Sequence, residues 1–347
     1  MSKPIRTFDH IPVIDISGLY SDNLADRQAV AAQIADAATH VGFLYIKGHK
    51  IPQLLIESLI SRAKAFFSLP YEEKMRFYIG KSVNHSGYVP VGEEFPEGNK
   101  QVAYGKVDNK EAYDINNDLG HLSQRRPMVG PTLWPEMAGF KEDVSAYYRA
   151  ALDLGRLLFR GFALALGLPE DTFDDKIQNP PSQLRLIHYP YSPEEQDRGG
   201  IGAHTDYECF TLLLPTADGL EVLNDNGEWI DAPVIPGCFV VNIGDMMEIL
   251  SNGRFVATGH RVRRVKEERY SFPLFCNCDY DTIIEPMVDP APGIEPGTYK
   301  PTPCGDHLFA QTIHTFRYLQ QRVKNGELQL PESSREVSSF GKLREVL

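Results

Sequence analysis

The sequence has no long uninterrupted hydrophobic run. Its most apolar stretch, residues 157–166, is interrupted by Arg160 and is far shorter than the roughly 20 apolar residues that a membrane-spanning helix needs. The N-terminal segment MSKPIRTFDHIPVID also has no apolar run of the length found in secretory signal peptides. We therefore expect a cytoplasmic protein that does not act at a membrane.

Cysteine is scarce, and its spacing does not match a zinc cluster. The five cysteines are an odd number, and only Cys276 and Cys278 lie close together in the sequence. On a strand these two residues would face the same side, which is more typical of small buried side chains than of a redox centre. This cysteine usage fits the expectation of a cytoplasmic protein.

The chain also lacks an excess of basic residues. It has 35 Lys and Arg against 47 Asp and Glu, which gives a formal net charge of -12. Nucleic acids and anionic membranes select for basic patches, so this balance argues against both as the main partner. We expect a small-molecule substrate, and the sequence leaves the oligomeric state open.

Short β-like runs dominate the second half of the chain. They are residues 184–189, 210–214, 220–223, 239–242, 261–262 and 270–272. Asp225-Asn226-Gly227 is a hairpin-turn signal between two of them. Many short strands separated by turns predict a barrel or a jelly roll.

Helical patterns flank this β-rich part on both sides. The sequence predicts helices over residues 25–39, 53–67, 135–166 and 306–324, strands over 12–16 and 42–46, and long loops over 81–124. We divide the chain into an N-terminal helical and loop region (8–125), a β core (180–285) and a C-terminal helix (305–326). Because helices precede and follow the strands, one compact unit is favoured over independent domains.

A potential metal site begins with His204-Thr-Asp206. Residues two apart on a strand point to the same face, so His204 and Asp206 can reach one ion, and His260 would join them from another strand. Two imidazoles and one carboxylate suit Fe(II) and leave open positions for a co-substrate and O2. His-x-Asp alone is a weak signal, and zinc could use the same ligands.

A second constellation follows in Arg269-Tyr-Ser271. Arg269 and Ser271 would also share one face of a strand, where a guanidinium can hold a carboxylate bidentately and a hydroxyl can add a hydrogen bond. Tyr189 could supply another hydroxyl, although a tyrosine on a strand is more often a core residue. Zinc chemistry alone would not explain this pair beside the metal ligands.

The order of several short motifs resembles the isopenicillin N synthase-like branch of the Fe(II)/2-oxoglutarate-dependent dioxygenases. The matching segments are residues 12–16, 42–49, 87–88, 110–111, 186–190, 204–207, 219–222, 242–245, 260–262 and 269–271. Each motif is weak alone, but together they cover most of the chain in the family's order.

This resemblance implies a double-stranded β-helix, or jelly roll, with packed helices, an α+β protein overall. It implies Fe(II) bound by His204, Asp206 and His260. It also implies that Arg269 and Ser271, with Tyr189, hold the carboxylate of the co-substrate 2-oxoglutarate. The expected activity is a dioxygenase that uses O2 to hydroxylate, desaturate or cyclise a small metabolite, while 2-oxoglutarate becomes succinate and CO2.

Two departures from the family pattern leave alternatives open. Ile187 stands where many hydroxylases of this branch have Asn, and the pattern is closer to isopenicillin N synthase, which uses this pocket for its own substrate instead of 2-oxoglutarate. Glu208-Cys209 replaces small or apolar residues and could shape the substrate side. A non-enzymatic metal-binding jelly roll is the third alternative.

Family position also nominates residues for the wall of the substrate pocket. They lie in the loops of residues 86–117 and near the ends of strands: Tyr88, Val91, Phe95, Tyr104, Phe210, Phe275 and Asn277. For each aromatic residue, packing in the core is at least as good an explanation.

Overall fold

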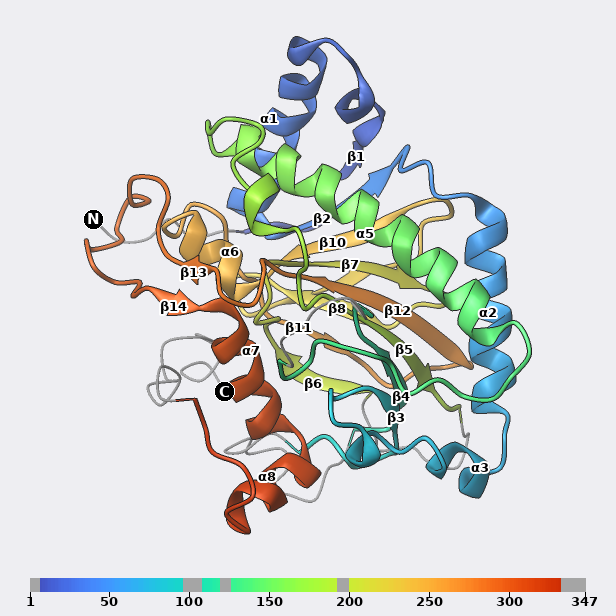
Figure 1. Cartoon of the computed structure of the whole chain (residues 1–347). Helices are drawn as coiled ribbons and strands as arrows, with labels where there is room; N and C mark the ends of the chain where they lie inside the picture. The colour runs from blue at the N-terminus through green and yellow to red at the C-terminus, as the bar shows by residue number, and fades with distance from the viewer. Residues whose placement is uncertain (1–6, 96–107, 119–125, 192–199, 332–347) are drawn as a thin grey trace.

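Two β-sheets form the centre of the molecule in the computed structural model, which describes residues 7–95, 108–118, 126–191 and 200–331 (Figure 1). The larger sheet has eight strands. In spatial order they are β1 (Val13–Asp15), β2 (Phe43–Lys47), β10 (Phe239–Ile243), β7 (Phe210–Pro215), β12 (Arg269–Cys276), β5 (Gln183–Tyr189), β4 (Glu111–Ile115) and β3 (Gly87–Val89). All neighbouring strands are antiparallel except β1 and β2.

A second, four-stranded sheet carries the other half of the β core. It consists of β6 (Ile201–His204), β11 (His260–Val262), β8 (Leu220–Leu223) and β9 (Trp229–Ala232), all antiparallel. A short hairpin pairs β13 (Ile283–Ile284) with β14 (Thr302–Pro303). Two largely antiparallel sheets with helices packed outside them confirm the expected jelly roll with flanking helices.

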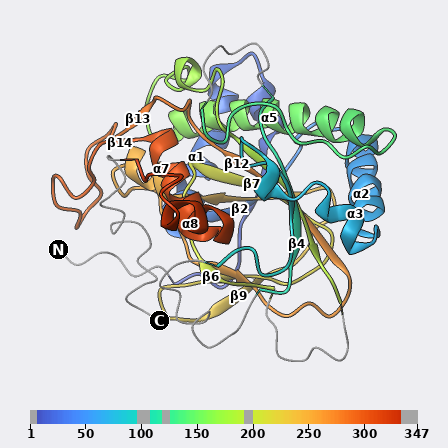
Figure 2. The same ribbon diagram turned by 60° about the horizontal axis from the view of Figure 1, so that its bottom comes forward.

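Helices cover the outer face of the larger sheet. They are α1 (Leu24–His40), α2 (Gln53–Phe67) and the long α5 (Phe140–Ala165), with α3 (Tyr71–Met75) after α2 and α6 (Asp245–Leu250) after β10. Helix α5 packs against α1, α2 and β12 (Figures 1 and 2). Two further helices, α7 (Cys304–Thr315) and α8 (Arg317–Lys324), lie at the other side of the β core.

Strand alternation explains which side chains reach the core between the sheets. On β7, Phe210 packs against Phe159 and Phe162 of α5, with ring centroids 4.8 and 5.0 Å away. Thr211, the next residue, points the opposite way and donates a hydrogen bond to Asp206. One face of the large sheet therefore binds helices, and the other faces the interior of the jelly roll.

The structure differs from the sequence prediction in several places, and α3, β6, β9 and α6 were not predicted. Residues 81–124, expected to be loops, contain β3 and β4, whose buried residues include polar ones and so show no simple alternation. The long helix begins at Phe140 rather than near 135, after Gly139 at a φ of 74°. The C-terminal helix is broken at Phe316, whose extended backbone separates α7 from α8.

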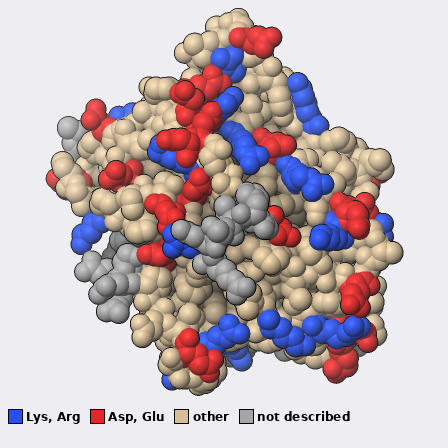
Figure 3. Space-filling view, viewed as in Figure 1, with Lys and Arg blue, Asp and Glu red and all other residues tan. Residues whose placement is uncertain are grey.

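Charged side chains of both signs are spread over the surface. Lys and Arg are interspersed with Asp and Glu on the face shown in Figure 3. None of the helices in the described part of the chain has the length and apolar character required to cross a membrane.

Candidate metal centre and co-substrate pocket

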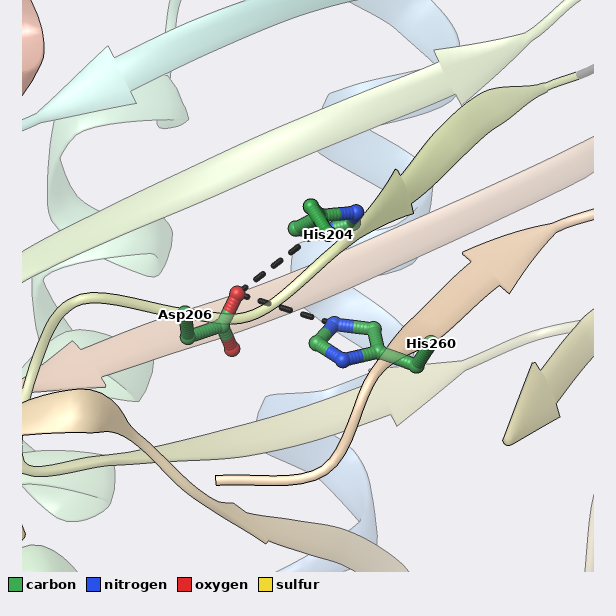
Figure 4. Close-up of side chains that lie close together, drawn as sticks. All are labelled: His204, Asp206 and His260. Atoms are coloured by element: carbon green, nitrogen blue, oxygen red, sulfur yellow. Dashed lines mark ion pairs between the residues drawn. The ribbon is translucent and has the colours of Figure 1, made fainter. Parts of the chain in front are cut away.

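Three side chains from two segments of the chain converge in the β core (Figure 4). His204 ends β6, His260 begins β11, and the two residues are direct partners in the antiparallel register. Asp206 follows β6, and its Oδ1 lies 3.6 Å from the Nε2 atoms of both histidines. The potential ligand atoms of all three residues lie within 4.8 Å of one another, so they can share one ion.

Backbone carbonyl groups orient both imidazoles toward the metal position. Nδ1 of His204 lies 2.8 Å from the carbonyl oxygen of Gly202, and Nδ1 of His260 lies 3.2 Å from that of Thr258. A carbonyl can only accept, so Nδ1 carries the proton in each ring. The lone pair on Nε2 is then free to bind a metal, which is the usual outer-shell arrangement of histidine ligands.

The second oxygen of Asp206 is held by two neighbours on the inner face of the large sheet. Thr211 of β7 and Asn242 of β10, which are register partners, both donate to Oδ2, and the Asn242 bond is 2.7 Å long. These bonds leave Oδ1 to face the histidines. The carboxylate is therefore set up as a ligand through one oxygen.

The backbone after Asp206 is fixed by the start of α6. The N–H groups of Gly244, Asp245 and Met246 donate to the carbonyl oxygens of Cys209, Asp206 and Glu208, at 3.0, 2.8 and 3.1 Å. A Cβ at position 244 would lie 2.1 Å from the Glu208 carbonyl oxygen, so only glycine fits there. This close approach gives a physical reason for the Asn242-Ile-Gly-Asp245 segment.

Burial and neighbouring charges set the protonation of the metal ligands. Burial opposes ionisation of Asp206, but the His260 and His204 imidazoles and two hydrogen bonds hold its pKa below the ordinary value. Burial, and then the nearby His204, lower the pKa of His260 to about 4. At neutral pH the site thus presents a carboxylate and a neutral His260, as metal binding requires.

Arg269 is a candidate anion-binding residue between the sheets. Its side chain is fully buried, its Nε donates to the Ala217 carbonyl oxygen at 3.0 Å, and its guanidinium lies 4.6 Å from the centroid of the Tyr189 ring. Nη1 and Nη2 have no hydrogen-bond partner in the described structure. Burial also lowers the pKa of Arg269, because a buried charge without a partner is unfavourable. A carboxylate bound there would balance the positive charge of the guanidinium group.

The register places the other predicted co-substrate residues beside this arginine. Tyr189 of β5 is the register partner of Arg269, and Ser271 is the partner of Ile187. Paired residues in an antiparallel sheet point to the same side, so all four side chains share the inner face. Two guanidinium nitrogens without hydrogen-bond partners among the described residues, with a serine and a tyrosine nearby, could therefore bind one carboxylate of a dicarboxylate co-substrate.

A cavity of about 250 Å³ opens beside His204 and Asp206. This volume lies just below the ~300–1,000 Å³ of common small-molecule sites, so the cavity fits a ligand at the small end of that class. Charged residues on its wall are Glu94, Asp108, Lys110, Arg185, Asp206 and Glu208. Of the residues nominated for the substrate pocket, Phe275 and Asn277 line this cavity, and so does Ile187.

Other nominated residues lie elsewhere, which corrects the sequence prediction. Phe210 is on the outer face against α5, and Tyr88 is also outward, with its hydroxyl donating to Glu111. Val91 is 45% exposed, and Phe95 packs under Arg317 rather than lining the cavity. Tyr104 lies outside the described residues.

Sequence reasoning missed the charged network of the cavity wall. Lys110 Nζ lies 2.6 Å from Glu94 and 3.8 Å from Asp108, and Arg185 pairs with Glu94 at 2.8 Å and with Asp114 at 2.7 Å. Alternation along β5 would have placed Arg185 on the same face as Ile187. Glu94 and Asp108 come from segments without periodicity, so no sequence pattern marked them.

Comparison with protein families gives two matches that together span most of the chain. Residues 11–137 match the family described as "non-haem dioxygenase in morphine synthesis N-terminal". Residues 180–277 match the 2OG-Fe(II) oxygenase superfamily. The second match contains His204, Asp206 and His260.

Characterised relatives and solved structures agree with these matches. Homoarginine-6-hydroxylase 2-ODD-233 of Oryza sativa subsp. japonica is 37% identical, covering 89% of this chain and 98% of the relative. The 2-oxoglutarate-Fe(II) type oxidoreductase ppzC of Metarhizium majus is 36% identical and covers 76% of each chain. Full-length Neurospora crassa T7H in complex with alpha-KG superposes with a TM-score of 0.73 at 27% identity, over 90% of this chain and 96% of T7H.

Proposed function

Because this chain belongs to the Fe(II)- and 2-oxoglutarate-dependent oxygenase superfamily, we propose that His204, Asp206 and His260 hold its catalytic iron and that it hydroxylates a small molecule. The main support for the iron assignment is that three potential ligand atoms converge. In both histidines Nδ1 is engaged by a backbone carbonyl group, which leaves Nε2 for the metal. Hydroxylation is the proposed outcome because relatives over 89% of the chain bear that activity in their names.

Arg269 is the proposed anchor for the far carboxylate of 2-oxoglutarate. Its two unpartnered nitrogens match the two oxygens of a carboxylate, and Ser271 lies two residues along the same face of β12. When bound, Fe(II) with 2-oxoglutarate and O2 supplies the oxidising power, giving succinate, CO2 and a hydroxylated product. The protein's own residues orient the co-substrate and exclude water from the space between the sheets.

The alternative that resembles isopenicillin N synthase has less support. It rests on Ile187, an apolar residue of the cavity wall. The Ile187 side chain has no polar atom that could favour a substrate carboxylate over 2-oxoglutarate in the Arg269 pocket. The relatives and the T7H complex are named for 2-oxoglutarate. We therefore assign the Arg269 pocket to the co-substrate.

Replacing Arg269 tests this assignment. We expect Arg269→Met to weaken 2-oxoglutarate binding by roughly 100-fold, since hydrogen bonds to a charged partner contribute about 1.5–3 kcal/mol each. The affinity for Fe(II) should stay within about threefold of the wild type. The measurement is the anaerobic absorption change when 2-oxoglutarate chelates Fe(II), followed by succinate release in the presence of O2.

The matched control is Arg156→Met, an exposed arginine on α5 that pairs with Asp153. It should bind 2-oxoglutarate like the wild type. Unchanged 2-oxoglutarate affinity in Arg269→Met would show that this pocket holds another ligand.

A further inference from the structure

Two hydrogen-bond acceptors stand together on the cavity wall beside the iron position. Glu208 lies two residues after Asp206, and Asn277 follows the end of β12; both line the cavity. Cys209 N–H donates to the Cys276 carbonyl oxygen at 3.1 Å, which joins the residue after Glu208 to the residue before Asn277. Neither side chain belongs to the proposed iron or 2-oxoglutarate site.

The Asn277 amide is held with its oxygen unused. Its Nδ2 donates to the Phe275 carbonyl oxygen at 3.4 Å, while the buried Oδ1 has no hydrogen-bond partner in the described structure. Rotating the amide by 180° would place Oδ1 of Asn277 beside the Phe275 carbonyl oxygen, and both atoms can only accept. The observed orientation is therefore the favourable one. A buried acceptor without a partner is costly, and a donor on the substrate would satisfy it.

Glu208 is the carboxylate of the cavity wall that lacks a basic partner. Glu94 and Asp108 are both paired with Lys110, and Arg185 is shared between Glu94 and Asp114. Within the described ranges no Lys, Arg or His side chain forms an ion pair with Glu208, which is 6% exposed. The two bases of the wall are thus already engaged, and the carboxylates outnumber them.

The backbone at Glu208 is fixed by contacts of its carbonyl group. Met246 N–H donates to its carbonyl oxygen, and Gly244 packs directly against the same group. Because Asp206 is held by the same turn, the distance from Glu208 to the iron position is set by a rigid segment. A substrate bound at Glu208 would be placed reproducibly relative to the iron.

We propose that Glu208 and Asn277 together bind a cationic nitrogen group of the substrate, a guanidinium or an ammonium, and so select the substrate class. This inference rests on the proposed function, because it assumes that the cavity beside the iron is the substrate cavity. A cation with several N–H donors satisfies the Asn277 oxygen and the unpaired Glu208 carboxyl group at once. A neutral or anionic substrate would not offset the excess of acidic over basic side chains on the wall.

The test uses matched pairs of small probes that differ in charge. Homoarginine with homocitrulline and arginine with citrulline compare a guanidinium with a neutral urea of nearly equal shape. Lysine with norleucine compares a side chain that ends in an ammonium with one of the same carbon count that lacks it. Binding is measured anaerobically as the perturbation of the Fe(II)–2-oxoglutarate absorption band, and independently by calorimetry with the Mn(II)-loaded protein.

We expect the wild type to prefer the cationic member of at least one pair by tenfold or more. Glu208→Gln should reduce that preference to within about threefold, while the exposed control Glu57→Gln leaves it unchanged. Asn277→Leu should weaken cation binding by about fivefold to tenfold, and Asn277→Asp, which keeps an acceptor, should restore it.

Two results would overturn the inference: no cationic probe binds better than its neutral partner, or Glu208→Gln retains the full preference. Either result with a normal Fe(II)–2-oxoglutarate band leaves the proposed function standing. Failure of the band itself in the wild type would instead refute the proposed function.

Discussion

At the scale of single residues, the metal centre depends on how Asp206 is held as much as on the three ligands. Its Oδ2 accepts from Thr211 and Asn242, so only Oδ1 is directed at the histidines. These two residues carry no metal-binding signal of their own in the sequence. Thr211 lies on β7, the next strand after Asp206, but Asn242 is 36 residues away on β10, so their shared role becomes visible only when β7 and β10 are paired.

Removing one of these hydrogen bonds should weaken metal binding without touching a ligand. We expect Asn242→Leu, which keeps the size of the side chain, to reduce Fe(II) affinity by about 10-fold to 100-fold, as is typical of outer-shell partners. Equilibrium titration with Fe(II) under anaerobic conditions measures the effect. Asn325→Leu at the exposed end of α8 is the control, and equal affinities of the two variants would contradict the assignment.

At the scale of secondary-structure elements, the face of each strand decides what its residues do. Phe275 on β12 is the register partner of Thr211 and lines the cavity, whereas Phe210 is the partner of Cys276 on the outer face. Two phenylalanines on neighbouring strands of one sheet therefore have different functions. The register distinguishes them although their residue types are the same.

Truncation of these two phenylalanines should affect different properties, mainly stability for Phe210 and mainly substrate binding for Phe275. We expect Phe210→Ala to lower the free energy of unfolding by about 3–5 kcal/mol, because it empties a site against Phe159 and Phe162 of α5. Phe275→Ala, whose side chain borders the cavity, should destabilise less and change substrate binding more. Urea unfolding and probe binding give both quantities, and a similar profile for both variants would refute the division into faces.

The same alternation shows how much of the site the sequence could predict. The convergence of the candidate ligands His204, Asp206 and His260 was predictable because their spacing and the order of motifs both point to them. The pocket residues Tyr88 and Phe210 were misplaced, because a strand's inner face is known only once its neighbours are known. The polar β4, with Glu111 and Asp114 buried, has no hydrophobic period and was taken for a loop.

At the scale of the whole molecule, burial of several histidines links folding to pH. Burial lowers the pKa of His85 to about 3, and that of His260 and His307 to about 4. In the unfolded chain each would titrate near 6.5. Between these values the unfolded state binds more protons than the folded state, so stability falls as the pH falls.

The metal-free protein should therefore be less stable at pH 5 than at pH 7. Each of these buried histidines can contribute up to about 2 kcal/mol to that loss. Urea unfolding at the two pH values measures it. His307→Leu should reduce the loss, whereas an unfolding free energy that is the same at both pH values would contradict this expectation.

An anaerobic crystal structure with Fe(II) and 2-oxoglutarate tests the central claim most directly. The account predicts one metal ion bound by Nε2 of His204, Oδ1 of Asp206 and Nε2 of His260, with the far carboxylate of 2-oxoglutarate on Nη1 and Nη2 of Arg269. A metal bound by other side chains, or 2-oxoglutarate held away from Arg269, would contradict it.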